Sequence, residues 1–160
     1  MDATWRRPAA LAALTASTLL AEVALTRVMS IAYFPHVAFL VLSTAMLGTG
    51  VAAALQSLRP ITEDAAGRGL TASLVAGTGV AFVVGHVIVH LVGAEPLAVS
   101  TSAAEAVRLA VALVALTLPF LVSGAAVTRL LTARREESFR MYAADLGGAA
   151  LGCAVAVPVM

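Results

Sequence analysis

Five long apolar stretches limit what this chain can fold into. A helix that crosses a lipid bilayer needs about 20 mostly apolar residues. The five stretches cover residues 8–33, 36–58, 70–93, 104–133 and 139–160. Hydrophobic residues make up 61% of the 160 residues and charged residues only 12%, whereas soluble domains average about 45–50% and about 25%. The sequence therefore predicts an all-α, polytopic membrane helical bundle of five transmembrane helices, with residues 1–160 as a single transmembrane domain.

Helix-breaking and helix-capping residues mark the expected boundaries. Pro35 disfavours a helix at the residue before it, which predicts a tight turn between the first two spans. Gly67 and Gly69 are expected to close the polar loop before the third span. The pattern Ser102-Ala103-Ala104-Glu105 predicts a capping box at the start of the fourth helix. Pro119 interrupts that helix and is expected either to shape its packing or to open a cavity.

The arginines fall in alternate connecting segments of the chain. They flank the first span, the second loop and the fourth loop, at Arg6, Arg7, Arg59, Arg68, Arg134, Arg135 and Arg140. The two intervening loops, residues 34–36 and 95–102, hold none. The positive-inside rule therefore predicts a multi-pass protein with a cytoplasmic N-terminus. With a formal net charge of +1 and no clustered basic face, no nucleic-acid partner is expected.

Small residues recur at every fourth position in two spans. In the third span they are Gly77, Ala81, Gly85 and Gly93, and in the fifth they are Ala144, Gly148, Gly152 and Ala156. Such stripes let two helix backbones approach closely within lipid. We therefore expect both stripes to be helix-packing faces.

Ionisable residues at membrane depth carry the functional signal, because charge is costly in lipid. The predicted topology places five of them in the outer half of the bilayer as a candidate buried polar cluster: Glu22, Arg27, His36, His86 and His90. Glu22 is expected to face the bundle interior and contact a histidine. Arg27 is expected at the outer rim.

Three interpretations of this cluster remain open. It could be a structural network of ion pairs, a small-molecule or proton site, or a metal site built on His86 and His90, which share one helical face. Neither a cysteine nor a glutamate within that histidine motif completes a ligand set. The sequence therefore predicts no metal and no cofactor.

A second polar group, Tyr142 and Asp145, lies on the cytoplasmic side by the same topology. Asp145 falls about one turn into the fifth span. Because the N-terminal end of a helix favours a carboxylate, capping-type stabilisation is the simplest expectation for Asp145.

Two stretches of the chain together form a recognisable pattern. The first is Glu22-Val-Ala-Leu-Thr-Arg27, continued through Tyr33 and His36-Val-Ala-Phe-Leu-Val-Leu-Ser43 to Leu47-Gly48. The second is Leu118-Pro119-Phe120 with Gly124, followed by Tyr142-Ala-Ala-Asp145 through Gly152-Cys153. Together they resemble the membrane domain of the bacterial spermidine synthase-like (polyamine aminopropyltransferase-like) integral membrane proteins. The resemblance is best in the first, second, fourth and fifth spans. The matched polar positions are Glu22, Arg27, His36, Tyr142 and Asp145.

The resemblance implies a bacterial inner-membrane module. Its expected role is to anchor or regulate a soluble aminopropyltransferase-like domain, with the lipid bilayer and possible further transmembrane helices as its other partners. The sequence has no strand–glycine-rich loop–helix unit and no acidic cluster to hold a polyamine. No catalytic residue carries over, and the chain alone is not expected to be an enzyme. The alternative is a transporter-like or small-ligand-binding protein that uses buried Glu, Arg and His.

Overall fold

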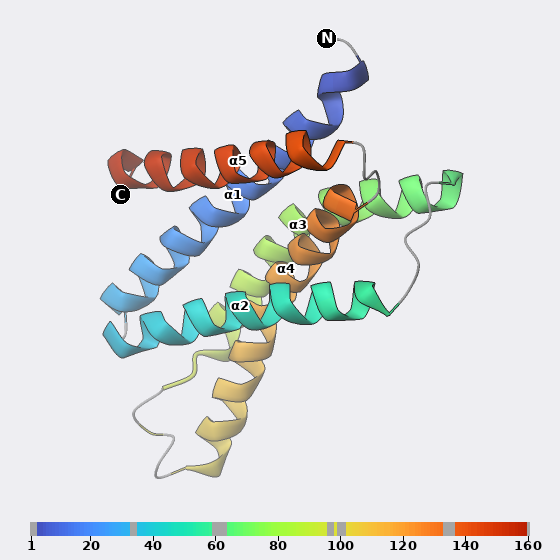
Figure 1. Cartoon of the computed structure of the whole chain (residues 1–160). Coiled ribbons are helices and arrows are strands. Elements are labelled where there is room, and N and C mark those ends of the chain that lie inside the picture. The colour runs from blue at the N-terminus through green and yellow to red at the C-terminus, as the bar shows by residue number, and fades with distance from the viewer. Residues whose placement is uncertain are drawn as a thin grey trace.

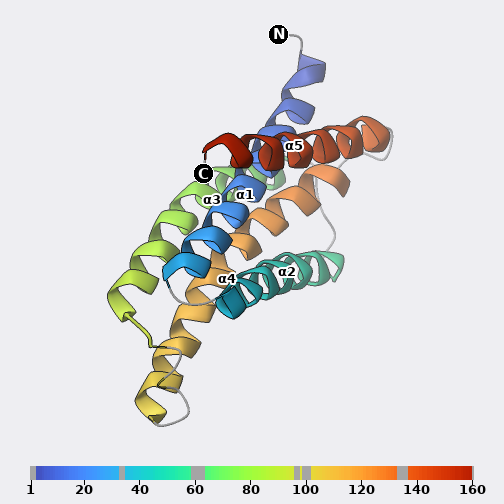
Figure 2. The same cartoon turned by 90° about the vertical axis from the view of Figure 1, so that its left-hand side faces the viewer.

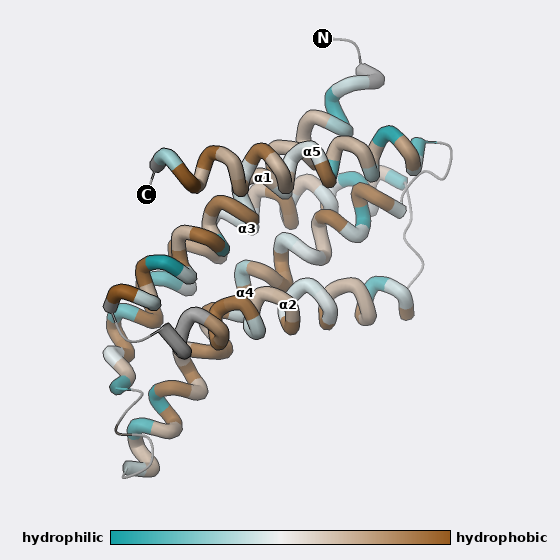
Figure 3. Tube along the Cα trace, turned by 60° about the vertical axis from the view of Figure 1, so that its left-hand side comes forward, coloured by the Kyte–Doolittle hydropathy of each residue, from teal (hydrophilic) through white to brown (hydrophobic). Residues whose placement is uncertain are grey.

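The structure, a computed structural model, describes residues 3–32, 35–58, 64–95, 98, 102–132 and 137–159. Within these residues the chain forms five helices: α1 (Ala3–Ala32), α2 (Pro35–Ser57), α3 (Ala65–Val92), α4 (Ala103–Thr132) and α5 (Ser138–Val159) (Figure 1). All five are long and apolar enough to cross a membrane. This confirms the predicted all-α bundle. Most of the hydrophilic segments lie toward the helix ends (Figure 3).

One predicted helix boundary and one predicted capping motif are wrong. The third helix begins at Ala65, so Gly67 and Gly69 lie inside it and do not close the loop. The reason is Asp64, whose side chain accepts a hydrogen bond of 2.7 Å from the Gly67 N–H and so caps the helix earlier. Helix α4 begins at Ala103, directly after Ser102, but the expected capping box does not form, because the Ser102 N–H donates to the Ala98 carbonyl and not to Glu105. The Glu105 carboxylate accepts hydrogen bonds from the Glu95 N–H and from Arg108.

Helix α4 is the centre of the bundle, with α2 and α3 packed on different sides of it (Figures 1 and 2). Glycines bring the backbones together. A Cβ atom added to Gly48 of α2 would lie 2.7 Å from the Thr117 carbonyl oxygen, and one added to Gly85 of α3 would lie 2.7 Å from the Ala115 carbonyl oxygen. Neither position has room for a side chain, so both contacts are backbone to backbone.

Pro119 shapes one of these contacts. Because proline has no N–H, the Ala115 carbonyl four residues earlier receives no hydrogen bond from it. Gly85 packs directly on that carbonyl, a geometry in which a Cα–H can serve as a weak donor. The helix nevertheless continues through Pro119 to Thr132. The proline therefore leaves a carbonyl of α4 free to contact α3, and α4 continues unbroken.

Helices α1 and α5 form the other extensive contact. Gly148 and Gly152 of α5 lie against the backbone of Ala12 and Ala16 of α1. This confirms the packing role predicted for the small residues of the fifth span. In the third span only Gly85 makes such an approach. Gly93 instead ends α3 in a left-handed conformation, with φ of 54°.

Replacing Gly148 with alanine should destabilise the bundle, because the new methyl group would overlap the backbone of Ala12. Overpacking of this kind costs about 1–3 kcal/mol. Gly147 is the matched control, since a Cβ there meets nothing within 4 Å. We expect Gly148→Ala, but not Gly147→Ala, to lower the melting temperature in detergent. Equal melting temperatures for the two variants would contradict the α1–α5 contact.

Candidate functional site

A line of polar side chains runs along one face of α1. Thr15, Thr18, Glu22 and Thr26, here called the α1 polar stripe, are spaced three or four residues apart and so share that face. Thr15 and Thr18 are buried, and Glu22 and Thr26 are half-buried. Threonines are common at interfaces between membrane helices, so the ionisable Glu22 is the member of the stripe that points to function.

The stripe crosses the middle of the bundle, between two apolar clusters. One cluster comprises Leu11, Leu14, Ala126, Leu130 and Met141. The other comprises Met29, Val41, Val89, Ala112, Ala115 and Leu116. Along α1, Thr18 and Glu22 fall between the clusters, and along α4 so do Pro119 and Ser123. This part of the core, here called the polar level, therefore holds polar side chains beside the fully buried Phe120, whose ring packs edge-on against Phe82 with centroids 5.3 Å apart.

Buried hydroxyls near this level donate hydrogen bonds to backbone carbonyls of their own helices. Thr18 donates to the Leu14 carbonyl at 2.9 Å, Thr44 donates to Val41 at 2.8 Å, and Ser123 donates to Phe120 at 3.1 Å. Each hydroxyl oxygen keeps lone pairs that can accept a further hydrogen bond. The buried hydroxyls thus offer acceptors, a chemistry suited to a ligand that donates.

Glu22 is the only carboxylate among the residues of this polar level. Only its backbone carbonyl takes part in an observed hydrogen bond, from Thr26 at 2.8 Å. Within the described part of the chain, its carboxylate has neither a hydrogen bond nor an ion pair. An unpaired carboxylate at this depth is costly for stability.

The structure does not bring the predicted histidines to Glu22. His86 and His90 of α3 are both exposed. These histidines could reach Glu22 only if α3 packed on α1, but Gly85 packs on α4 instead. A groove separates α1 from α3, and His86 lines it beside Ala21.

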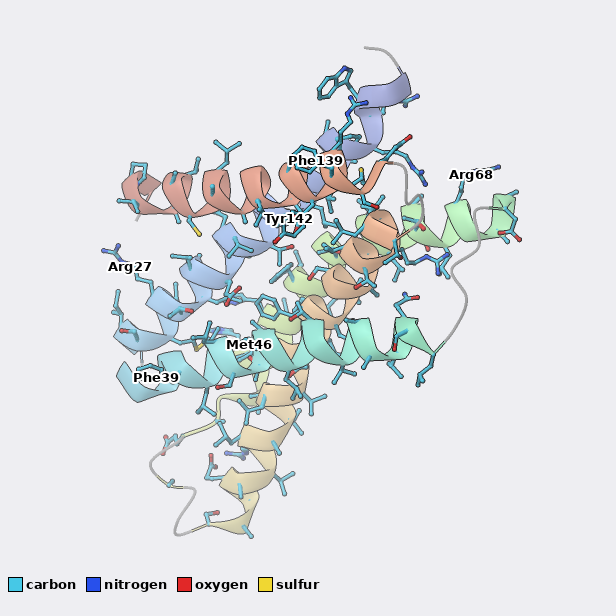
Figure 4. All side chains as sticks on the ribbon, viewed as in Figure 1. Arg27, Phe39, Met46, Arg68, Phe139 and Tyr142 are labelled. Atoms are coloured by element: carbon cyan, nitrogen blue, oxygen red, sulfur yellow. The ribbon has the colours of Figure 1, made fainter. Side chains whose placement is uncertain are left out.

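The two remaining members of the predicted cluster lie near the α1–α2 connection. The Arg27 side chain is exposed and points away from the helices (Figure 4). The His36 side chain lies outside the described residues. Within the described residues, no group of three or more His, Cys, Asp or Glu could hold a metal ion.

Asp145 joins α5 to the inner end of the stripe. It accepts a hydrogen bond of 2.6 Å from Thr15, whose hydroxyl also lies 3.0 Å from the Leu11 carbonyl. The capping role expected for Asp145 is therefore replaced by a bond between helices, because the α1–α5 crossing places Thr15 beside it. Tyr142 is exposed on α5 (Figure 4).

Two arginine contacts were not anticipated from the sequence. Arg129 of α4 is 6% exposed and donates to the Thr71 hydroxyl at 3.1 Å and the Gly67 carbonyl at 3.2 Å, which fastens α4 to the start of α3. The Arg140 guanidinium lies 4.4 Å from the centre of the Trp5 ring, which joins the starts of α1 and α5. Each contact joins residues on different helices, so the spacing of residues along the chain does not indicate it.

These contacts gather several arginines at one end of the bundle, formed by the starts of α1, α3 and α5 and the end of α4. Of the described residues, this arginine-rich end holds Arg6, Arg7, Arg68, Arg129 and Arg140. Arg27 and Arg108 lie toward the opposite helix ends.

Comparison of the chain with known proteins found no matching family model, no matching curated protein and no matching solved structure. The site is therefore interpreted from its own geometry.

The Thr15–Asp145 bond should be measurable as a coupling between the two positions. In a double-mutant cycle with Thr15→Val and Asp145→Ala, we expect a coupling of about 0.6 kcal/mol in unfolding free energy, the mean for bonds between membrane helices, for which the maximum is about 1.7 kcal/mol. Thr18→Val is the matched control, because the Thr18 hydroxyl bonds only within α1. A coupling of similar size for Thr18 and Asp145 would show that the bond is not specific.

Proposed function

We propose that the chain is the membrane module of a spermidine synthase-like protein in a bacterial inner membrane. Its arginine-rich end faces the cytoplasm, and the module anchors or regulates a soluble aminopropyltransferase-like domain. The transfer chemistry belongs to that domain and not to this chain. The positive-inside rule supports the orientation. The exposed Trp5 and Tyr142 at the same end suit a membrane interface, since Trp and Tyr are enriched at both interfaces.

One observation supports the family assignment most directly. The two resembling stretches are far apart in sequence, yet they supply each other's packing partners. Gly48, from the first stretch, lies against the backbone of α4 at Thr117 and Leu121, on either side of the second stretch's Leu118-Pro119-Phe120. Gly124, from the second, lies against Thr49, next to Gly48. If the two stretches are the membrane-domain motifs of that family, they are expected to pack against each other in this way.

Deleting the chain from its host should remove aminopropyl transfer activity from the membrane fraction. The assay is transfer from decarboxylated S-adenosylmethionine to putrescine in separated membranes and cytosol. The purified chain should show no transfer, because the proposal assigns it no catalytic residue. Transfer by the purified chain, or membrane-bound activity that survives the deletion, would contradict the proposal.

A second function is favoured by Glu22, as a binding site for a small cationic ligand. Its carboxylate is half-buried and has no partner within the described residues. Buried hydroxyl oxygens near the same level, those of Thr18 and Ser123, can accept hydrogen bonds. A carboxylate with hydroxyl acceptors suits an ammonium group, which carries three donors and no acceptor. In this proposal the polar level is retained for binding, at a cost in stability.

Glu22→Gln should raise stability and remove ligand binding together. Removing an unpaired charge at membrane depth should stabilise the bundle by roughly 1–2 kcal/mol. Putrescine, used as the probe, should raise the melting temperature of the unmodified chain but not that of Glu22→Gln. Arg27→Gln is the matched control and should change neither quantity, because Arg27 is exposed. An unchanged response of Glu22→Gln to putrescine would exclude this function.

A further inference from the structure

The groove between α1 and α3 has two sections that meet at Phe82. The section nearer the arginine-rich end has a volume of about 430 Å³ and the other about 400 Å³. Both volumes lie in the range of sites that hold small molecules, about 300–1,000 Å³. The lining is apolar except for Ser17, Thr78 and His86. The groove is therefore a mostly apolar surface groove that runs along the side of the bundle.

The two helices that form the walls of the groove, α1 and α3, each carry an arginine on the groove face at the arginine-rich end, whereas α4 contributes only Leu116 and Pro119 to the lining. On α1, Arg6 precedes the lining residues Ala10, Ala13 and Ser17 by four, seven and eleven residues. On α3, Arg68 precedes the lining residues Val75 and Gly79 by seven and eleven residues. These spacings keep residues on one helical face. Both arginine side chains are exposed (Figure 4 labels Arg68).

The distance along α1 from Arg6 to the level of Phe82 matches one leaflet of a bilayer, and on α3 the fourteen residues from Arg68 to Phe82 span about 21 Å. Ser17 and Phe82 line the same section of the groove. Eleven helical residues from Arg6 to Ser17 span about 16 Å. Half of a bilayer's hydrocarbon core is about 15 Å. An acyl chain that begins at the arginines would therefore reach roughly to Phe82.

From this combination of charge, length and apolar lining, we propose that the α1–α3 groove binds an anionic phospholipid. One acyl chain lies in the groove between α1 and α3, and the phosphate lies at its mouth beside Arg6 and Arg68. The apolar lining of the section nearer the arginine-rich end supplies affinity for any acyl chain. The two arginines supply the preference for an anionic headgroup, because basic pockets between membrane helices bind such headgroups.

Native mass spectrometry can test both parts of this proposal on the full chain. The protein is released from micelles that contain equal amounts of phosphatidylglycerol and phosphatidylcholine with identical acyl chains. We expect the unmodified protein to retain phosphatidylglycerol preferentially. The variant Arg6→Gln/Arg68→Gln should lose this preference by about fivefold for each arginine removed. The matched control Arg27→Gln/Arg108→Gln should keep it, since these arginines lie toward the opposite helix ends.

Filling the groove tests the position of the acyl chain. Gly79 lines the groove, and a Cβ there meets nothing within 4 Å. Gly79→Leu should therefore fold normally but retain at least about fivefold less of both lipids, as expected when a filled site is overpacked. Gly147→Leu, on α5, is the matched control because its Cβ is equally unobstructed.

Equal lipid retention by Gly79→Leu and Gly147→Leu would overturn the proposal. So would an unmodified protein that retains the two lipids equally. A protein dimer that disappears only in Gly79→Leu, with lipid retention unchanged, would instead assign the groove to a second copy of the chain.

Discussion

Contact between helix backbones is the interaction on which this bundle depends. In lipid there is no hydrophobic force between helices, so association relies on close packing and hydrogen bonds. Gly48 and Gly85 bring α2 and α3 onto the carbonyl oxygens of α4, and Gly148 brings α5 onto α1. These contacts set where the helices lie relative to one another, and so which polar side chains can meet. The Thr15–Asp145 bond, for example, forms only because α5 crosses α1 at that level.

The number and approximate extent of the helices could be predicted because the length of each apolar stretch can be counted directly in the sequence. Helix ends were less predictable where two signals compete, as at Asp64, whose cap outweighs the two glycines that follow. The small-residue stripe containing Gly148 was recognisable as a packing face. Its partners Ala12 and Ala16 were not, because alanine is abundant throughout α1.

The candidate site was only partly predictable for a geometric reason. Topology gives the depth of a residue in the membrane, but neither the face of its helix nor the order of neighbouring helices. Glu22 and His86 were assigned to the same half of the bilayer, yet His86 is among the residues that line the α1–α3 groove and Glu22 is not. Arg129 was missed for a related reason, since an arginine near the end of a span is usually expected at the headgroups. Here it is buried against α3.

The pairing of α1 with α5 has a consequence for biosynthesis. The two partners in the Thr15–Asp145 bond are 130 residues apart in the sequence. Ribosomes add about 5–20 residues per second, so roughly ten seconds separate the synthesis of the first helix from that of its main partner. During that interval the Thr15 and Thr18 hydroxyls can donate to the Leu11 and Leu14 carbonyls of their own helix, which lie 3.0 and 2.9 Å away. The first helix to be made is thus the last to complete its contacts.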